Sequence, residues 1–429
     1  MAVLYLRVLV AGIPAGIIRQ DEHGLMTFAY DEDYQGPPLS LSMPLSNRVY
    51  GPDVMRPYLF GLLPDSELQR RAIARELGVS ANNPVALLAH IGLDCPGAVQ
   101  LCLPERLDEA RSRAGERREL TDHEIALRLK TVRDEPEVSW MGLEERWSLG
   151  GNQGKFALAG VGGRWYECRG AAPTTHIFKN GVVGFRLQAL NEYVCMRTAE
   201  RCGVAVAHAD YRFFEDEPAL IVERYDRVRD ASGTVVRMHQ EDLCQALSVM
   251  PDRKYTEDGG PSARDVMRLL AGTVHGKLNL LLFSQQLFYN ALIGAPDAHA
   301  KNYSLLLGLG RNAGLAPMYD VASGLAYERL RRRPRLAMSV GGENRVGRIG
   351  AGALERYVGA GDPEFAALLD RAGLTLASCR ALMADLAQEV PVAMAEAFEE
   401  SAGVPGADEL REHLLEPVVA TCRRTLASL

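Results

Sequence analysis

The feature that most limits how this chain can fold is a polar loop that carries Asp297 and Asn302 in the pattern D-x4-N. An apolar run at 305–307 follows and is expected to form a strand, and a second strand at 315–319 would then deliver Asp320. Phosphoryl transfer needs one carboxylate to orient and deprotonate the attacking hydroxyl group, and an amide oxygen and a second carboxylate to hold Mg²⁺ against the phosphates. Protein kinases carry these groups in this order along the chain. The pattern therefore predicts a kinase-like lobe with Asp297 as the base and with Asn302 and Asp320 as the metal ligands.

By itself the D-x4-N pattern also fits an ordinary solvated turn, so the features upstream of it matter. The first is a Gly-rich polar loop between two apolar, strand-like flanks, with Lys155 at its end. Backbone N–H groups in such a loop can cradle phosphate oxygens, and the lysine adds positive charge. The loop matches neither the Walker A pattern nor G-x-G-x-x-G, and a plain hairpin turn is the alternative. The residues expected to contact phosphate are Gly150, Gly151, Asn152, Gln153, Gly154 and Lys155.

The second upstream feature is Lys179, which ends a strand-like run at 174–179. A kinase small lobe places at such a point the lysine that reaches the nucleotide phosphates. Glu192, in the first turn of a helix expected at 189–202, is a candidate ion-pair partner that would fix this lysine. The alternatives are a solvated lysine at a sheet edge and a surface carboxylate that complements the helix dipole.

The third upstream feature is an apolar strand at 219–222 that leads directly into Glu223, Arg224 and Tyr225. In a kinase, a hinge of this kind joins the two lobes, and its backbone would hydrogen-bond adenine while Tyr225 flanks the base. A core strand that simply leaves its sheet is the alternative. The order of all these features is nevertheless that of a bilobal protein kinase, with a β-rich N-terminal part and a mostly helical C-terminal lobe.

We therefore expect an α+β fold of the protein-kinase-like type. Short strands are expected at 4–10, 15–19 and 25–30, and the charged, apolar-poor stretch 105–119 is expected to be an exposed connection. The expected domains are residues 1–145 (an α+β subdomain), 146–226 (the small lobe) and 227–429 (the helical large lobe). Helices are expected at 67–77, 241–248, 263–271, 277–292, 364–372, 377–398 and 407–427, and Pro391 should bend or break the long one.

Composition limits the kind of protein and the partners it can have. The net charge of −7 and the pI of about 5.8 argue against non-specific binding of nucleic acid by the whole surface. The dense basic run at 327–335 is either a mobile, solvated loop or a docking site for an acidic partner or nucleic-acid phosphate. The eight cysteines form no C-x2-C pair, which fits a reduced cytosol, and no apolar run is long enough to span a membrane.

Motifs along nearly the whole chain resemble a known family, the HipA-like serine/threonine kinase toxins of bacterial toxin–antitoxin pairs. The motifs at 60–65 and 91–98 imply the full-length form of the family, which has an extra N-terminal subdomain. The loop departs from the family pattern at Gly154, where the family more often has an acidic residue before the lysine. The stretches that carry the resemblance are residues 60–65, 91–98, 148–155, 173–179, 191–193, 222–226, 240–245, 254–255, 258–261, 297–302 and 317–320.

The resemblance implies roles for individual residues. Asp297 would be the catalytic base, Asn302 and Asp320 would bind Mg²⁺, and Ser148 matches the serine that the family autophosphorylates. ATP would be the phosphate donor, with its phosphates on the Gly-rich loop and Lys179. The remaining residues expected at the nucleotide are Glu223, Arg224, Tyr225, His299, Ala300, Lys301 and Tyr319.

The resemblance also implies partners and a biological role. The family's typical partner is a small helix-turn-helix antitoxin, HipB-like, that binds operator DNA as a dimer. Its known target class is the aminoacyl-tRNA synthetases, notably the glutamyl enzyme, and modification of that target arrests growth. Two other functions stay open at this point. One is a catalytically weak, kinase-shaped corepressor that holds the antitoxin on DNA, and the other is a small-molecule phosphotransferase on the same fold.

Overall fold

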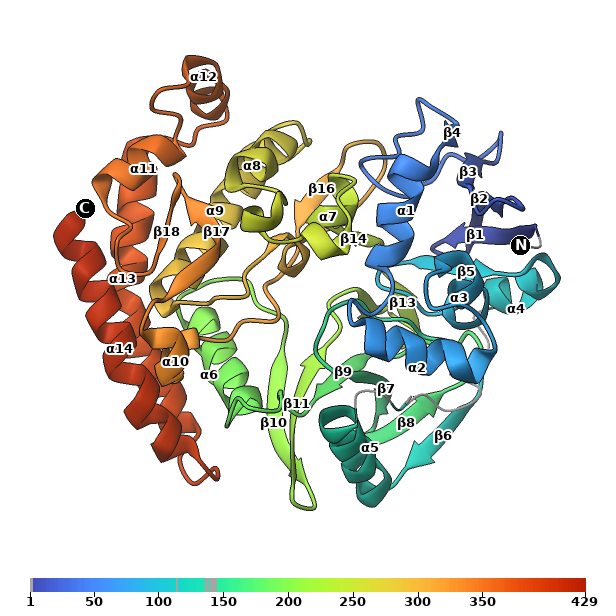
Figure 1. Ribbon diagram of the computed structural model, residues 1–429, viewed down its shortest axis with the longest axis horizontal. Helices are drawn as coiled ribbons and strands as arrows, with labels where there is room; N and C mark the ends of the chain where they lie inside the picture. The colour runs from blue at the N-terminus through green and yellow to red at the C-terminus, as the bar shows by residue number, and fades with distance from the viewer. Residues whose placement is uncertain (1–2, 113–114, 136–137, 139–144) are drawn as a thin grey trace. The chain divides into compact units, whose positions relative to one another are not determined.

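The computed structural model describes residues 3–112, 115–135, 138 and 145–429 (Figure 1). The chain divides into two compact units. Unit 1 comprises Met1–Gly184, Asp210–Asp252 and Leu305–Asn312, and unit 2 comprises Phe185–Ala209, Arg253–Ser304 and Ala313–Leu429. Over the described part of the chain, no helix combines the length and the apolarity needed to cross a membrane.

Unit 1 begins with a five-stranded antiparallel sheet in the order β4-β3-β2-β1-β5. Alternate residues of β1, among them Leu6 and Val8, are buried, and helices α1 and α3 pack on the sheet. Helix α2 begins after Ser66, whose hydroxyl accepts the Gln69 N–H, and ends at Gly78 in the left-handed conformation. The elements are β1 (Leu4–Val10), β2 (Ile13–Gln20), β3 (Met26–Tyr30), β4 (Val49–Tyr50), α1 (Pro52–Gly61), α2 (Glu67–Leu77), α3 (Pro84–Ile91) and β5 (Val99–Cys102).

A second sheet in unit 1 has the strand order β10-β11-β9-β7-β8-β6, and α5 covers its core of buried aromatic side chains. The described residues of the stretch 105–119 are mostly exposed, as expected, but they form regular elements. This stretch forms η1 and α4, with Ala110 fully buried, and enters the edge strand β6, because its few apolar residues suffice for one short element. The elements are η1 (Pro104–Arg106), α4 (Leu107–Ser112), β6 (Arg117–Leu120), α5 (Asp122–Asp134), β7 (Phe156–Val161), β8 (Arg164–Cys168), β9 (His176–Lys179), β10 (Ala209–Phe214) and β11 (Glu217–Glu223).

The rest of unit 1 consists of short elements that follow β11. The helix expected at 241–248 is only one turn long, because residues 240–242 form a strand and Asp242 caps the turn that follows. These elements are β12 (Arg227–Arg229), β13 (Val235–Arg237), β14 (Gln240–Asp242), α7 (Leu243–Ala246), η2 (Pro251–Arg253) and β15 (Ser304–Leu307).

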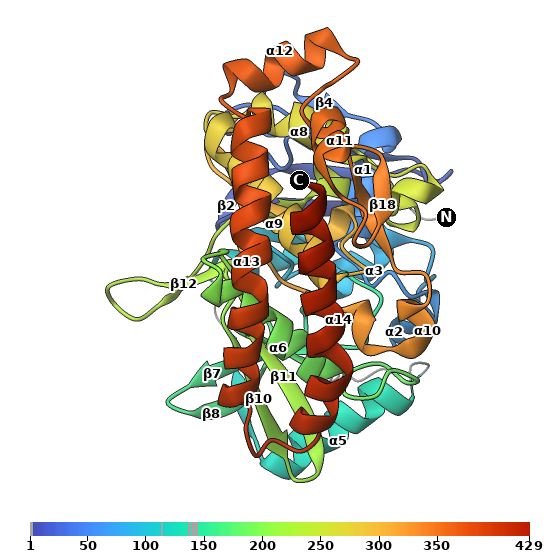
Figure 2. The ribbon, with the colours of Figure 1, turned by 90° about the vertical axis from the view of Figure 1, so that its left-hand side faces the viewer.

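Unit 2 is mostly helical, as expected. The long helices α13 and α14 lie side by side in both views (Figures 1 and 2), and the buried helix α9 packs against them. Of the bend or break expected at Pro391, the break is wrong, since α13 runs through this residue as one helix, and a bend stays a prediction. The helices are α6 (Gln188–Arg201), α8 (Ala263–Ala271), α9 (Gly276–Ile293), α10 (Glu328–Arg331), α11 (Ala351–Tyr357), α12 (Pro363–Arg371), α13 (Leu376–Glu400) and α14 (Ala407–Ser428).

Two predictions about short elements of unit 2 need correction. The strand expected at 315–319 ends at Leu315, and Met318 makes only an isolated bridge to Val206. The basic run at 327–335 has no buried residue, which fits a solvated segment, but it forms the short helix α10 and leads into the strand β17, and the docking alternative stays a prediction. The short elements are η3 (Thr256–Asp258), η4 (Ala300–Asn302), β16 (Ala313–Leu315), η5 (Gly324–Ala326), β17 (Arg335–Val340) and β18 (Glu343–Arg345).

Candidate active site

In unit 2, the D-x4-N loop folds back on the carbonyl group of Asp297. The side-chain amide of Asn302 donates to this carbonyl oxygen at 2.6 Å, and the His299 N–H donates to it at 2.8 Å. The loop follows α9, which ends at Gly294 with φ of 66°. The Asp297 side chain is 64% exposed. The backbone is thus fixed by its own polar groups, while the carboxylate is left accessible to a substrate.

Two aromatic side chains position the Asp297 carboxylate. The Tyr255 hydroxyl donates to Asp297 Oδ1, and the rings of Tyr255 and His299 meet edge to face with their centroids 4.9 Å apart. His299 Nε2 lies 3.7 Å from the same carboxylate oxygen. Ala300 N–H donates to the carbonyl oxygen of Lys254 at 3.3 Å, which holds the Tyr255 segment beside the loop. Reasoning from sequence did not give Tyr255 a role at the site, although it lies in a motif that carried the family resemblance.

Asp320 is brought to the loop by the residue before it. The Tyr319 hydroxyl donates to the carbonyl oxygen of Lys301 at 2.9 Å and lies 2.6 Å from Ser304 Oγ. Asp320 itself has φ of 56°, a left-handed conformation that few residues other than glycine adopt. Such backbone strain is concentrated at functional sites. The structure therefore brings together the expected residues of this half: Asp297, His299, Ala300, Lys301, Asn302, Tyr319 and Asp320.

The donor groups of Asn302 and Asp320 are chemically suited to Mg²⁺. One amide oxygen and one carboxylate are hard oxygen ligands, and proteins bind Mg²⁺ through one or two carboxylates with substrate phosphates and water. The Asn302 amide nitrogen is engaged with the Asp297 carbonyl group, which directs the amide oxygen away from that contact. The residues present thus fit the ion.

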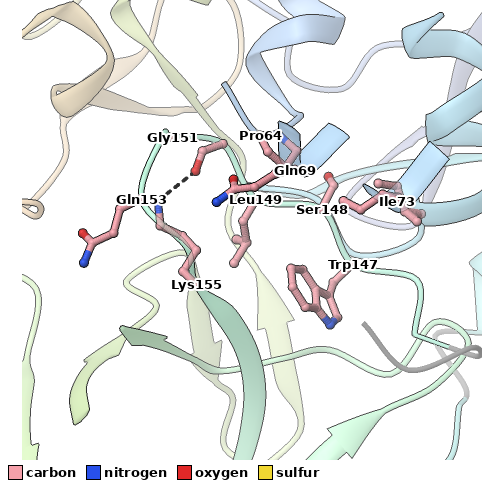
Figure 3. A pocket seen from close by; sticks show the side chains of 11 residues that line it. Pro64, Gln69, Ile73, Trp147, Ser148, Leu149, Gly151, Gln153 and Lys155 are labelled. Atoms are coloured by element: carbon pink, nitrogen blue, oxygen red, sulfur yellow. Dashed lines mark hydrogen bonds between the residues drawn. The ribbon is translucent and has the colours of Figure 1, made fainter. Parts of the chain in front are cut away.

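In unit 1, the lysine at the end of the Gly-rich loop bonds back to the start of the same loop (Figure 3). Lys155 Nζ donates to the carbonyl oxygen of Gly150 at 3.1 Å. Gly151 has φ of 100°, and a Cβ atom there would lie 2.4 Å from Lys155 Nζ. A Cβ atom at Gly154 would lie 2.5 Å from the carbonyl oxygen of Val132 on α5. A side chain at this position would therefore clash with α5.

The two lysines expected at the phosphates end neighbouring strands. Phe156 of β7 faces Phe178 of β9 in antiparallel register. One residue further along this register, Lys155 comes opposite Lys179, and both residues are buried. Glu192, the expected partner of Lys179, is a buried residue of α6 in unit 2. The Lys179–Glu192 ion pair stays a prediction.

The three hinge residues differ in their exposure and in their hydrogen-bond partners. Glu223 ends β11 opposite His176 and is exposed. The Arg224 N–H donates to the carbonyl oxygen of Thr175 at 2.9 Å, and its side chain is buried among carboxylates. The Tyr225 hydroxyl donates to Gln240 Oε1. The side chain and the backbone N–H of Arg224 are thus both engaged within the protein.

Ser148 lies at the start of the Gly-rich loop and is only 1% exposed. Its N–H donates to the carbonyl oxygen of Asp94 at 3.1 Å, and its hydroxyl donates to Cys95 Sγ at 3.3 Å. Burial raises the pKa of the Cys95 thiol to about 12, so the sulfur stays protonated and neutral. The cavity that Ser148 and Trp147 line has a volume of about 10 Å³ (Figure 3), which is room for about one water molecule.

Two family models match this chain. The model of the HipA N-terminal domain matches residues 6–102, and that of the HipA-like C-terminal domain matches residues 147–394. The protein Y4mE of Sinorhizobium fredii is 38% identical over 352 residues, which cover 80% of this chain and 82% of that protein. The serine/threonine-protein kinase toxin HipA of Shewanella oneidensis is 30% identical over 429 residues, which cover 93% of this chain and 91% of that protein.

A solved structure agrees with these matches. The structure of the Shewanella oneidensis HipA, HipB and operator DNA complex superposes with a TM-score of 0.78 at 26% identity, covering 98% of this chain and 97% of that chain. The C-terminal match includes the Gly-rich loop, both lysines, the hinge and the catalytic loop. This chain therefore belongs to the HipA family of serine/threonine kinase toxins, in the full-length form with both HipA domains.

Proposed function

We propose that this kinase transfers the γ-phosphate of ATP to a serine or threonine of a protein, with Asp297 as the catalytic base. In this step the substrate oxygen bonds to the γ-phosphorus, the bond to the ADP oxygen breaks, and Asp297 takes the hydroxyl proton. The observation that carries the proposal is the exposed Asp297 carboxylate, held by the Tyr255 hydroxyl on a loop that also carries Asn302. When bound by Asn302 and Asp320, Mg²⁺ would neutralise charge on the phosphates.

The nucleotide-holding residues of the proposal lie in unit 1. Lys155 and Lys179 end adjacent strands, and they supply positive charge for phosphates at one end of the sheet. The backbone of residues 150–154 would donate N–H groups, and the hinge residues 223–225 would hold adenine. The division into domains at 145 and 226 is part of the same proposal.

Ser148 is the residue we propose for autophosphorylation. Because it is buried beside a cavity that holds about one water molecule, it can accept a phosphate only after the loop has moved outward. A phosphate adds a charge of roughly −1.5 to −2, which would then keep the loop away from the phosphates of ATP. We expect one molecule to modify another, since transfer within one active site would be sterically awkward.

The partners we propose follow the relatives. The Shewanella oneidensis protein was solved with HipB and operator DNA. We infer a similar helix-turn-helix antitoxin for this chain, contact with DNA mainly through that antitoxin, and a cytoplasmic location. An aminoacyl-tRNA synthetase, such as the glutamyl enzyme, is the proposed substrate whose phosphorylation arrests growth. The complex of the Shewanella oneidensis protein with HipB and DNA also supports a second candidate function, in which this chain is a weak kinase that acts as a corepressor.

Two experiments test the proposal. The purified protein is incubated with labelled ATP and Mg²⁺, and we expect labelled protein from the wild type and none from Asp297→Ala. Mass spectrometry of phosphoproteins after brief induction then identifies the substrate and separates a protein kinase from a small-molecule phosphotransferase. Wild-type protein that binds an antitoxin but incorporates no phosphate would favour the corepressor.

A further inference from the structure

Five charged side chains are buried together in unit 1, where the segment after α3 meets the residues around and after the hinge. They belong to Asp94, Arg224, Asp226, Arg227 and Arg237, and they are 0–4% exposed. We call this group the Asp94 cluster. It contains three guanidinium groups and two carboxylates, and buried charges persist only when they are paired and hydrogen-bonded.

The Asp94 carboxylate is the common acceptor in this cluster. Its Oδ1 lies 2.9 Å from Arg227 Nη2 and 2.8 Å from Arg237 Nη2, and its Oδ2 lies 3.4 Å from Arg224 Nη1. Thr174 donates both its N–H, at 3.0 Å, and its hydroxyl, at 2.7 Å, to Oδ2. Burial alone would raise the pKa of this carboxyl, but the guanidinium groups lower it below its ordinary value. Asp94 is therefore ionised. Along the chain its partners lie before β9 (Thr174) and after the hinge strand β11 (Arg224, Arg227 and Arg237).

The backbone of the same residue holds the start of the Gly-rich loop. The N–H groups of Leu93 and Asp94 both donate to the carbonyl oxygen of Arg146 at 3.1 Å, and the Ser148 N–H donates to the carbonyl oxygen of Asp94 at 3.1 Å. Asp94 and Trp147 form a parallel bridge. Residues 146–148 thus run beside residues 93–95 as a short parallel pair, and this pair buries Ser148.

A second attachment holds the loop further along. The Asp65 N–H donates to the carbonyl oxygen of Gly151 at 2.9 Å, and Pro64 bridges to the same residue. Both attachments come from the segment matched as the HipA N-terminal domain. The attachment at Asp94 is fixed by fully buried charges, because its carboxylate neutralises guanidinium groups that would otherwise repel one another.

We propose that Asp94 is a positioning residue for nucleotide binding, whose carboxylate anchors residues 93–95 and thereby keeps the Gly-rich loop in its folded-in conformation with Ser148 covered. The inference rests on the proposed role of this loop in holding the phosphates of ATP. Without the Asp94 charge, three buried guanidinium groups share one carboxylate and must recruit water. The segment then shifts, and the bonds to Arg146 and Ser148 are lost. The apparent affinity for ATP falls in proportion to the fraction of molecules that keep the loop inward.

The test combines hydrogen–deuterium exchange with steady-state kinetics on the full-length protein. In Asp94→Asn we expect amides of residues 146–151 to exchange about tenfold faster, and KM for ATP to rise about tenfold while kcat stays within about threefold. Amides of α13 and α14 should keep their wild-type protection, which separates a local release from unfolding. The matched control is Asp31→Asn, which removes a carboxylate from the pair with Arg7 (2.6 Å) in the N-terminal sheet and should change neither readout.

A second variant covers the case in which Asp94→Asn does not fold. Arg237→Gln removes one partner of Asp94 but keeps the Asp94 carboxylate, and it should give a smaller change of the same kind. Wild-type exchange at 146–151 and wild-type KM in either folded variant would overturn the proposal. If wild-type protein turns over no ATP, the proposed function fails instead, and the exchange experiment still decides whether Asp94 anchors the loop.

Discussion

The two halves of the proposed site are built in opposite ways. In unit 2, Asp297 lies on an exposed loop, and its carboxylate is positioned by the Tyr255 hydroxyl. In unit 1, the Gly-rich loop is held by buried residues, and behind it lies the Asp94 cluster with side chains at most 4% exposed. The Asp297 carboxylate, the proposed base, can thus be removed with little loss of packing, whereas the Gly-rich loop, which we propose holds the nucleotide, depends on the same contacts that keep unit 1 folded. Substitution of Asp297 should therefore lower activity with little loss of stability. Substitutions around the Gly-rich loop should lower both activity and stability.

The largest effect on activity is expected from Asp297→Ala. Loss of the base should lower kcat by about 10²–10⁴-fold. Because the side chain is exposed and contributes little to the core, the free energy of unfolding should change by no more than about 1 kcal/mol. Phosphate incorporation and urea unfolding, measured on the same preparation, check both expectations. A folded variant with wild-type activity would remove Asp297 from the proposed mechanism.

Asp320→Asn should also lower activity strongly, through the metal. Asparagine tolerates the left-handed conformation at φ of 56°, so the backbone should be kept while the carboxylate charge is lost. In wild-type protein we expect ATP to raise Tm only when Mg²⁺ is present. The variant should lose this dependence but keep the Tm of the wild-type protein without nucleotide. An unchanged, Mg²⁺-dependent rise in Tm would contradict the assignment of Asp320 as a ligand.

A smaller effect, confined to ATP binding, is expected from Gly151→Ala. The new Cβ atom would lie 2.4 Å from Lys155 Nζ, so the lysine must leave the carbonyl oxygen of Gly150. KM for ATP should rise about tenfold, which corresponds to about 1.4 kcal/mol. Gly162→Ala is the matched control, because Gly162 also has positive φ but a Cβ atom there meets nothing within 4 Å. Equal effects of the two substitutions would mean that backbone strain, and not the clash with Lys155, is responsible.

The last expected effect concerns stability alone and lies in unit 1. Burial raises the pKa of Glu241 to about 8 from an ordinary 4.5, and Leu41 N–H donates to its Oε1 at 2.8 Å. The protonated form stabilises the fold, so this contribution is fully present below the unfolded pKa and is lost as the pH rises through about 8. Between pH 5 and 8 the free energy of unfolding should fall by roughly 1 kcal/mol per pH unit.

Glu241→Gln should flatten this pH dependence, because the amide keeps an acceptor for the Leu41 N–H and cannot ionise. Urea unfolding of both proteins at several pH values between 5 and 8 measures the difference. Parallel pH profiles would mean that Glu241 is not the group responsible.

Sequence patterns predicted the elements whose signals are local. Helix α2 carries its own start and stop at Ser66 and Gly78, and the α+β fold and the mostly helical C-terminal part were both confirmed. Elements that depend on tertiary packing were missed. Pro391 does not interrupt α13, since packing of a long helix can offset one lost hydrogen bond. The stretch 105–119 was predicted to be an exposed connection and is mostly exposed, but it also forms a short helix around the buried Ala110 and an edge strand.

The residues of the candidate site divide in the same way, into those with a local sequence signal and those without one. The order of the motifs predicted Asp297, Asn302 and Asp320 as one group, and all three lie in unit 2, while their roles stay predictions. The positioning residues Tyr255 and Asp94 were not assigned roles, since nothing local shows that a tyrosine 42 residues before Asp297 reaches its carboxylate. The arginines at 227 and 237, close after the hinge, were the available signal for a buried partner such as Asp94.

The proposed mechanism separates two roles. The loop that carries Asp297 performs the chemistry, and residues of unit 1 hold the nucleotide. The most direct test is equilibrium binding of ATP to Asp297→Ala in the presence of Mg²⁺, measured by calorimetry beside an assay of phosphate transfer. We predict a Kd within about threefold of the wild-type value together with loss of transfer, since the base acts on the hydroxyl group and not on ATP. Transfer at the wild-type rate, or loss of ATP binding in the folded variant, would contradict this separation.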